Sequence, residues 1–476
     1  MLGLRSMRAL LPLVVLVILT GCYDAASSRG GGQVSAARAK ARAANPQDIE
    51  VPPGYRVELV ADRLSFPTGI AFGDGRTFVV ESGYAYGEVL TKPRLLELVA
   101  GGVKELATGD GAPWNGVAYH DGALYVAHGG ALTGGRIVRY DLAGNAKVLV
   151  EGLPSLGDHH TNGPVVADGW IYFGQGTVTN AGVVGPDAAE YGWLARHPKL
   201  HDTPCEDITL AGRNWKSGAA TTGAYHAFGT SGPAGEVVRG ALPCNGAVMR
   251  IPVAGGPLEL VAWGFRNPFG LAVDGRGDLY VTDNAYDMRG SRPIYGVADV
   301  IWHVERGRWY GWPDFAEGRA VTRDEFAESD GDPGGFVLSS HPRLPPEPVA
   351  QLAVHAAAVG FDFSRSARFG HVGSAFVALF GDMAPTTGKV MSPVGFKVVR
   401  VDLRTHDVED FARNRGDAPG PATKKQQRGL ERPIAARFDP SGDALYIVDF
   451  GIMRLTDKGP APQPNTGRIW RITRAR

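Results

Sequence analysis

The sequence predicts an all-β fold, a six-bladed β-propeller with a loop insertion. Two observations lead to this prediction: a strand–turn–strand pattern recurs six times, and a further strand pair follows most of the copies. Four short strands in a unit of about 45 residues are typical of one propeller blade. The copies begin at Gly69, Gly116, Gly163, Gly270, Gly360 and Ala435.

The spacing of the copies indicates where the insertion lies. The first two intervals are equal, from Gly69 to Gly116 and from Gly116 to Gly163, and later intervals are longer. The extra length predicts loop insertions, chiefly about residues 180–245. The final strand, GRIWRITR (467–474), stands alone. We expect it to pair with a strand from the start of the chain, because closing the ring removes the open sheet edges.

Composition fits a globular protein rich in turns and excludes several classes. Of the 476 residues, 66 are glycine and 33 proline, and 44% are hydrophobic. The 49 basic and 49 acidic residues cancel, so no nucleic-acid surface is indicated. The three cysteines are too widely spaced for a zinc or haem attachment pattern. The sequence contains no strand–GxGxxG–helix unit, so it does not indicate a dinucleotide-binding fold.

The N-terminus predicts export. Residues 1–21 carry two arginines and then an apolar run too short to span a bilayer comfortably, which is typical of a signal peptide. The following LTGC resembles the lipobox of bacterial lipoproteins, which predicts lipidation of Cys22; the alternative is an ordinary signal with an incidental cysteine. Residues 22–46 then form a flexible tether and residues 47–476 the propeller. We expect the protein on the periplasmic or cell-surface side, held at the membrane by its lipid anchor only.

Export also bears on the other two cysteines. Cys205 and Cys244 form an even pair in an oxidising compartment, which predicts a disulfide. Closing a loop of about 40 residues stabilises a fold by about 3 to 4 kcal/mol in the chain-entropy account.

The loops that enter the blades of a propeller converge on one end of its channel. Each candidate residue stands just before the first strand of a copy, so we expect all of them on one face. Two arginines, two amides and several histidines around one cavity suit a planar polyanionic ligand and a proton transfer. The candidates are Asn115, His159, His160, Arg266, Asn267, His355 and Arg432.

Three motifs carry a resemblance: LPSLGDHHTNG (153–163), WGFRNPFGLAVD (263–274) and VTDNAYDMRGSRP (281–293) with RWYGWPDF (308–315) after it. In this order they resemble the glucose/sorbosone dehydrogenase family, over about residues 55–474 and closer to the sorbosone-type branch. The soluble glucose dehydrogenases of that family use pyrroloquinoline quinone on a six-bladed propeller.

The resemblance implies roles for the candidates. His159, preceded by Asp158, matches the catalytic base, and Arg266 would stabilise the oxyanion that develops on the quinone. Ala285 and Tyr286 would offer backbone carbonyls to calcium, which accepts oxygen ligands in irregular geometry. The other residues expected at the cofactor or substrate are Asn115, Asp158, His160, Asn267, His355 and Arg432.

The chain departs from the family pattern at two informative positions. Leu430 stands where the glucose enzymes have a second cofactor arginine, and Thr177 stands where they have the acidic residue that orients the catalytic histidine.

The sequence thus predicts a quinone-dependent oxidoreductase for a sugar or a sugar-derived aldehyde or alcohol. Its expected cofactors are pyrroloquinoline quinone and calcium, and an external quinone or cytochrome would accept the electrons. Two alternatives stay open at this point: a calcium-dependent lactonase-type propeller hydrolase, and a non-catalytic lipoprotein that binds a sugar or a protein.

Overall fold

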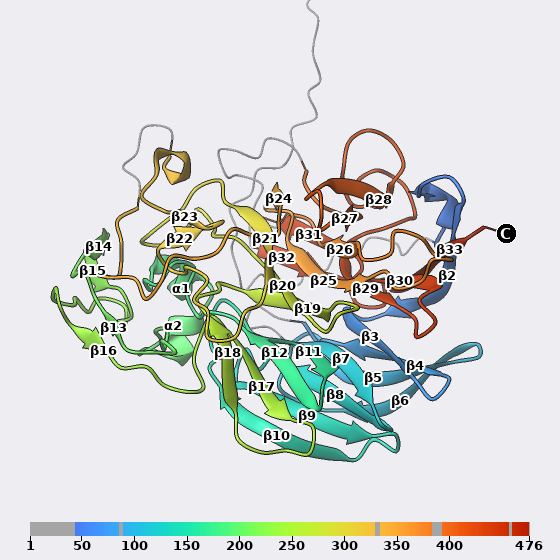
Figure 1. The fold of residues 1–476 in the computed structure, drawn as a ribbon, viewed down its shortest axis with the longest axis horizontal. Coiled ribbons are helices and arrows are strands. Elements are labelled where there is room, and N and C mark those ends of the chain that lie inside the picture. Colours follow the sequence, from blue (N-terminus) through green and yellow to red (C-terminus); the bar gives the residue numbers. More distant parts are fainter. Residues whose placement is uncertain (1–42, 85–88, 329–333, 383–392, 457–458, 476) are drawn as a thin grey trace, which may run out of the picture.

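A computed structural model describes residues 43–84, 89–328, 334–382, 393–456 and 459–475. Within these ranges the chain forms six blades around a central channel, which confirms the predicted fold class (Figure 1). The predicted signal peptide, Cys22 and most of the tether lie outside the described residues. Asn45 already bonds through its amide to the carbonyl of Arg428, so the packed domain begins slightly before residue 47.

The first two blades are built from consecutive strands. Their innermost strands contain buried and half-buried residues only, whereas their outermost strands are largely exposed. Blade 1 contains β3 (Pro67–Gly73), β4 (Arg76–Glu81), β5 (Arg94–Val99) and β6 (Gly102–Thr108). Blade 2 contains β7 (Trp114–His120), β8 (Ala123–His128), β9 (Gly135–Asp141) and β10 (Ala146–Leu153).

The next two blades are interrupted by long excursions. Blade 3 contains β11 (Thr161–Ala167), β12 (Trp170–Gln175), β17 (Ala247–Pro252) and β18 (Glu259–Trp263). Blade 4 contains β19 (Pro268–Val273), β20 (Leu279–Asp283), β21 (Ala298–His303) and β24 (Ala350–Val354).

Segments from the start of the chain complete the last two blades. Blade 5 contains β25 (Ala358–Phe363), β26 (Ala375–Leu379), β27 (Lys397–Val401), β28 (Val408–Asn414) and, at its edge, β1 (Ile49–Glu50). Blade 6 contains β29 (Pro433–Phe438), β30 (Ala444–Asp449), β33 (Gly467–Arg474) and β2 (Tyr55–Leu64). The antiparallel pairing of β2 with β33 confirms the predicted closure, and Figure 1 shows these two strands side by side.

Two excursions leave the ring on one side. Residues 176–246, between β12 and β17, contain the Cys205–Cys244 disulfide, as predicted. Sequence patterns did not separate the second excursion, residues 304–349 between β21 and β24. Short elements of these excursions are α1 (Pro186–Glu190), α2 (Trp193–Arg196), β13 (Ile208–Thr209), β14 (Asn214–Ser217), β15 (Ala220–Gly223), β16 (Val237–Val238), β22 (Phe315–Ala316), β23 (Arg319–Ala320) and the 3-10 turn Asp324–Phe326. The remaining elements are the 3-10 turn Pro46–Asp48 and the hairpin β31 (Met453–Thr456) and β32 (Gly459–Pro462).

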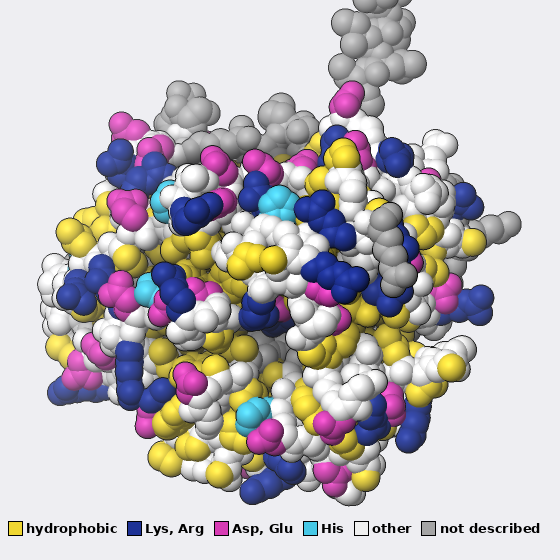
Figure 2. Space-filling model, turned by 45° about the vertical axis from the view of Figure 1, so that its right-hand side comes forward, with side chains coloured by type: hydrophobic (Ala, Val, Ile, Leu, Met, Phe, Trp, Pro, Cys, Tyr) yellow, Lys and Arg dark blue, Asp and Glu magenta, His cyan; other side chains and the backbone are white. Residues whose placement is uncertain are grey.

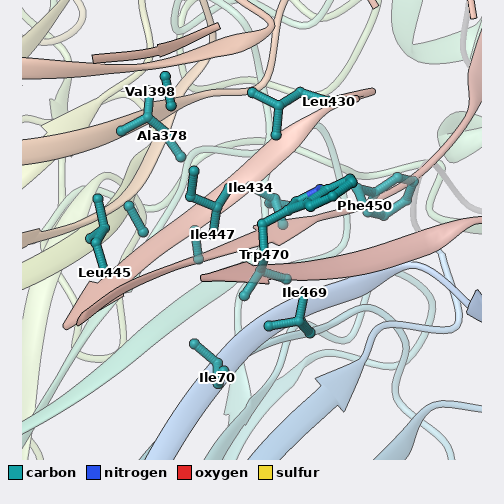
Figure 3. Packing of buried hydrophobic residues seen from close by; sticks show 14 of the residues in the cluster. Ile70, Ala378, Val398, Leu430, Ile434, Leu445, Ile447, Phe450, Ile469 and Trp470 are labelled. Carbon is teal, nitrogen blue, oxygen red and sulfur yellow. The ribbon is translucent and has the colours of Figure 1, made fainter. Parts of the chain in front are cut away.

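The repeating glycines of the sequence lie where the innermost strands crowd together at the channel. A Cβ on Gly116 would lie 2.0 Å from the carbonyl oxygen of Gly163, and one on Gly270 would lie 2.3 Å from that of Val359. Only glycine permits this approach. Between blades, buried side chains such as Leu445, Ile447 and Trp470 fill the space (Figure 3).

The surface is mixed in charge. Figure 2 shows basic and acidic side chains interspersed over one face, which agrees with the balanced composition. Within the described part of the chain, no helix has the length and hydrophobicity needed to cross a membrane.

Candidate active site

Two adjoining cavities open at the end of the channel where the chain enters the blades. The first, about 150 Å³, is lined by Asn115, Asp158, His159 and His160 among others, and we call it the histidine cavity. The second, about 340 Å³, is lined by Arg432, Glu431, Lys424 and Arg454 among others, and we call it the arginine cavity. Met453 lines both.

A ring of side chains borders the histidine cavity, and one half of the ring is polar. Each ring residue directly precedes the small residue that lines the channel in its blade. Blades 1 to 3 contribute polar side chains and blades 4 to 6 apolar ones. The members in blade order are Thr68, Asn115, Asn162, Phe269, Val359 and Ile434.

Four asparagines form a directed chain of hydrogen bonds along this cavity. Each Nδ2 donates to the next Oδ1, from Asn115 to Asn162 (3.0 Å), to Asn267 (3.0 Å) and to Asn284 (2.9 Å). Asn284 donates in turn to the carbonyl of Ala358 at 2.6 Å. Because a carbonyl can only accept, it fixes the orientation of every amide in the chain.

His159 lies on the loop before β11, with its side chain buried in this cavity. Its Nδ1 lies 2.9 Å from the carbonyl oxygen of Thr177 and 3.2 Å from the Thr177 hydroxyl. The carbonyl accepts only, so Nδ1 carries the proton and Nε2 of the neutral ring is a bare acceptor. Burial lowers the pKa of His159 to about 3, so the ring is neutral at ordinary pH.

The Asp158 carboxylate lies at the centre of a buried charge network. Its Oδ2 is 3.6 Å from His159 Nε2, 3.6 Å from Arg266 Nη2, and paired with Arg289. Burial would raise its pKa, but the guanidinium groups of Arg289 and Arg266 outweigh burial and lower it. His159 and Arg266 therefore lie on either side of one carboxylate.

Arg266 comes close to His159, as the sequence led us to expect, but its guanidinium bonds to protein groups instead of lining the histidine cavity. It donates to the Asn180 carbonyl (3.1 Å) and side chain (2.9 Å), to Asp287 (2.9 Å) and to the Asn284 carbonyl (3.4 Å). Asp287 has a strongly lowered pKa: burial would raise it, and Arg266 and Arg289 outweigh burial.

The other two candidate histidines, His160 and His355, are buried with one ring nitrogen unpaired among the described residues. His160 lines the histidine cavity, where its Nε2 has no hydrogen-bond partner in the described structure, and burial lowers its pKa to about 4. His355 has φ 59°, places Nδ1 3.7 Å from Asp287, and likewise leaves Nε2 unpaired within the described ranges. An unpaired buried nitrogen is a point where a ligand hydrogen bond would stabilise.

Arg432 lies in the arginine cavity, behind the end of β26. Its Nη1 donates to the carbonyls of Gly381 (2.9 Å), Asp382 (3.2 Å) and Phe380 (3.4 Å). Its guanidinium carbon lies 5.0 Å from the ring centres of both Phe380 and Phe396. These contacts fix the guanidinium beside a cavity that also contains Lys424 and Arg454.

Leu430, two residues earlier, is fully buried in the apolar core and labelled in Figure 3. Glu431 lines the arginine cavity instead, and burial raises its pKa to about 7.

The predicted calcium ligands, Ala285 and Tyr286, lie on the loop after β20. The Ala285 amide donates to Asp299 (2.9 Å), and the Tyr286 hydroxyl donates to the carbonyl of Phe315 (3.0 Å). In the described ranges, no group of three or more His, Cys, Asp or Glu side chains could hold a metal ion. A calcium ion here would depend on main-chain oxygens.

Sequence reasoning missed three residues of the site: Asn162, Asp287 and Arg289. Asn162 could have been found, because it precedes Gly163 as Asn115 precedes Gly116. Asp287 and Arg289 carry no such signal, since their partners come from distant loops.

Solved structures share this fold. The chain aligns with the holo pyranose dehydrogenase PQQ domain of Coprinopsis cinerea at 16% identity and TM-score 0.55, over 93% of this chain and 100% of that one. It aligns with a calcium structure of the Trichoderma reesei carbohydrate-active enzyme of family AA12 at 13% identity and TM-score 0.54, over 92% and 99%. It aligns with the apo form of the soluble aldose sugar dehydrogenase of Escherichia coli at 15% identity and TM-score 0.51, over 88% of this chain and 100% of that one. No family model matches the chain, and no curated protein matches it.

Proposed function

We propose that this protein is a quinone-dependent oxidoreductase that oxidises a sugar, or a sugar-derived aldehyde or alcohol, with His159 as the base. The observation that carries the proposal is the state of His159: a buried neutral imidazole with a bare Nε2 in a cavity edged by amides. Its fold is also that of the quinone-containing domain of pyranose dehydrogenase.

The donor set fits pyrroloquinoline quinone, a planar polyanion. Arg432, Lys424 and Arg454 of the arginine cavity would hold its carboxylates, and Asn115, His160 and Asn267 would bond to its polar edge. Phe269, Phe380 and Phe450 offer apolar contact to a flat ring. Calcium would rest on the carbonyls of Ala285 and Tyr286.

The bound quinone would supply a carbonyl carbon that accepts a hydride. His159 would take the proton of a substrate hydroxyl on Nε2 as the hydride leaves the carbon that bears this hydroxyl. An alcohol or a cyclic sugar then becomes a carbonyl compound, and an aldehyde, which would react as its hydrate, becomes a carboxylic acid. Thr177 would hold the ring in the required tautomer through Nδ1. Arg266 lies beside the same carboxylate as His159 but bonds to protein groups, so it would act on negative charge that develops at the cofactor edge through its positive charge and not through a hydrogen bond.

No specific contact favours either alternative. A lactonase-type hydrolase needs acidic side chains that converge on a metal, and the described residues contain no such cluster. A non-catalytic binding protein is separated from an enzyme by measuring turnover.

We further propose that the domain is exported and anchored through Cys22, with an external quinone or cytochrome as electron acceptor. Labelling with radioactive palmitate, with Cys22→Ala as the control, tests the anchor.

Reconstitution tests the activity. The purified protein should bind pyrroloquinoline quinone in the presence of calcium and then reduce an artificial dye with at least one member of a panel of aldoses and sugar aldehydes. Failure of every substrate with a quinone-loaded, folded protein would contradict the proposal.

A further inference from the structure

Arg289 joins its own loop to two segments that are far from it in the sequence. Its guanidinium pairs with Asp158 of the His159 loop, with Asp187 of α1 at 2.5 Å, and with Asp287 at 3.1 Å. It also lies 5.2 Å from the ring centre of Tyr191. Nothing in the sequence singled this arginine out, and the proposed reaction does not use it.

The geometry around Nε2 of His159 explains what such an arginine can do. Nδ1 holds the proton because it faces the carbonyl of Thr177. The bare Nε2 and the Asp158 carboxylate, 3.6 Å apart, therefore both present lone pairs to each other. An unpaired carboxylate in this position would favour a proton on Nε2.

Arg289 opposes protonation of Nε2, because its guanidinium forms an ion pair with the Asp158 carboxylate. The charged groups that act on His159 are Asp158 and Asp287, which favour protonation, and Arg266 and Arg289, which oppose it. Arg266 bonds directly to Asp287 but stays 3.6 Å from Asp158. Arg289 is thus the cation in closest contact with the carboxylate nearest the imidazole.

We propose that Arg289 is a positioning residue for His159: it holds the Asp158 carboxylate away from Nε2 and so keeps that nitrogen unprotonated and able to accept a proton. This inference rests on the proposed function for its purpose, but the state of the imidazole can be measured without quinone or substrate. Asp187 also binds Arg289, so the excursion of residues 176–246 is connected through Arg289 to the loop of His159.

The test is nitrogen NMR of the full-length protein labelled with ¹⁵N-histidine, with His159→Asn to assign the signal. In the parent protein, Nε2 of His159 should show the shift of a bare imidazole nitrogen through the whole pH range above 5. In Arg289→Gln the midpoint of its protonation should rise by about one pH unit or more, because a released carboxylate then faces the ring.

Two further variants make the result specific. The double variant Asp158→Asn with Arg289→Gln removes the carboxylate as well, so it should return the midpoint toward the parent value. Arg292→Gln is the matched control: Arg292 is a buried arginine of the same loop that binds Asp314 at 3.0 Å, so its loss should leave the His159 signal unchanged.

Arg289→Lys keeps one positive charge but cannot span the three carboxylates, so its midpoint should lie between those of the parent and Arg289→Gln. It also serves as the test if Arg289→Gln does not fold. An unchanged midpoint in the folded arginine variants would overturn the proposal. Failure of the reconstituted parent to oxidise sugars would count against the proposed function and leave this measurement intact.

Discussion

Blades 4 and 6 use the same backbone device at the entry to their first strands. In blade 4, the Asp283 carboxylate at the end of β20 accepts the amides of Arg266 (3.1 Å) and Asn267 (2.7 Å). Trp302 Nε1 lies 3.4 Å from the same carboxylate. Pro268 follows and begins β19.

In blade 6, Asp449 at the end of β30 accepts the amides of Glu431 (2.9 Å) and Arg432 (2.8 Å). Trp470 Nε1 lies 3.4 Å away, and Pro433 follows. We call these two arrangements the aspartate caps.

The side chains on the two caps differ completely. Arg266 in blade 4 corresponds in position to Glu431 in blade 6, and Asn267 corresponds to Arg432. Blade 4 thus supplies a guanidinium to the charge network beside His159, whereas blade 6 supplies one to the arginine cavity. The repeat therefore fixes the backbone, while the chemistry depends on which residue each copy places on it.

Removal of either cap should give the largest effect on stability. Asp283→Ala and Asp449→Ala each leave buried amide donors unpaired, at a cost of about 1 to 3 kcal/mol per donor. We expect a similar loss of about 3 to 5 kcal/mol from both variants, measured by denaturant unfolding. A large loss from one and almost none from the other would break the equivalence of the two caps.

Substitution of the two arginines should separate their roles. Arg266→Gln leaves Asp158 and Asp287 with fewer cations in a buried site, so we expect a loss of about 2 to 4 kcal/mol in folding free energy. Arg432→Gln should instead act mainly on quinone affinity, weakening it by about tenfold to a hundredfold through loss of a charge-assisted contact. Parallel thermal unfolding and quinone titration of both variants test the contrast; equal effects in both assays would refute it.

Glu431, the cap residue of blade 6, should make the free energy of unfolding depend on pH, whereas Arg266 at the same position of blade 4 should not. Burial raises the pKa of Glu431 to about 7, above the ordinary 4.5. The folded state therefore holds a proton that the unfolded state releases, so stability is lost as the pH rises from 4.5 to 7, by up to about 1.4 kcal/mol per pH unit. Glu431→Gln should flatten the stability–pH profile in this window, and an unchanged slope would count against a protonated Glu431.

We expect the smallest effect when the pH dependence of kcat/KM is measured. Because burial lowers the pKa of His159 to about 3, the base is already unprotonated near neutrality. We expect kcat/KM of the reconstituted enzyme to show no decline as the pH falls from 7.5 to 5.5. A decline with a midpoint near 6.5 would instead indicate an imidazole with its ordinary pKa.

Much of the architecture could be predicted because it depends on local patterns. The small residue near the start of each first strand, a glycine in five blades and Ala435 in the sixth, marks the channel. The single strand at the C-terminus required a partner, which β2 provides. Thr177, which the family resemblance placed beside the catalytic histidine, does contact the ring of His159.

The charge network could not be predicted in the same way. Asp158 and Asp287 from two loops and Asp187 from α1 meet at Arg289, and no local pattern specifies which carboxylate faces which guanidinium. For the same reason, the sequence placed Arg266 on the cavity wall, although its guanidinium is engaged by Asn180 and Asp287. Pairings between loops depend on tertiary geometry that strand periodicity does not encode.

The central claim, that His159 is the base of a quinone-dependent oxidation, is tested most directly by single-turnover kinetics. Parent protein and His159→Gln, both loaded with pyrroloquinoline quinone, are mixed with an active sugar, and reduction of the quinone is followed by stopped-flow absorbance. We expect similar quinone affinity in both proteins and a rate of quinone reduction about 10² to 10⁴ lower in the variant. Equal reduction rates would contradict the claim.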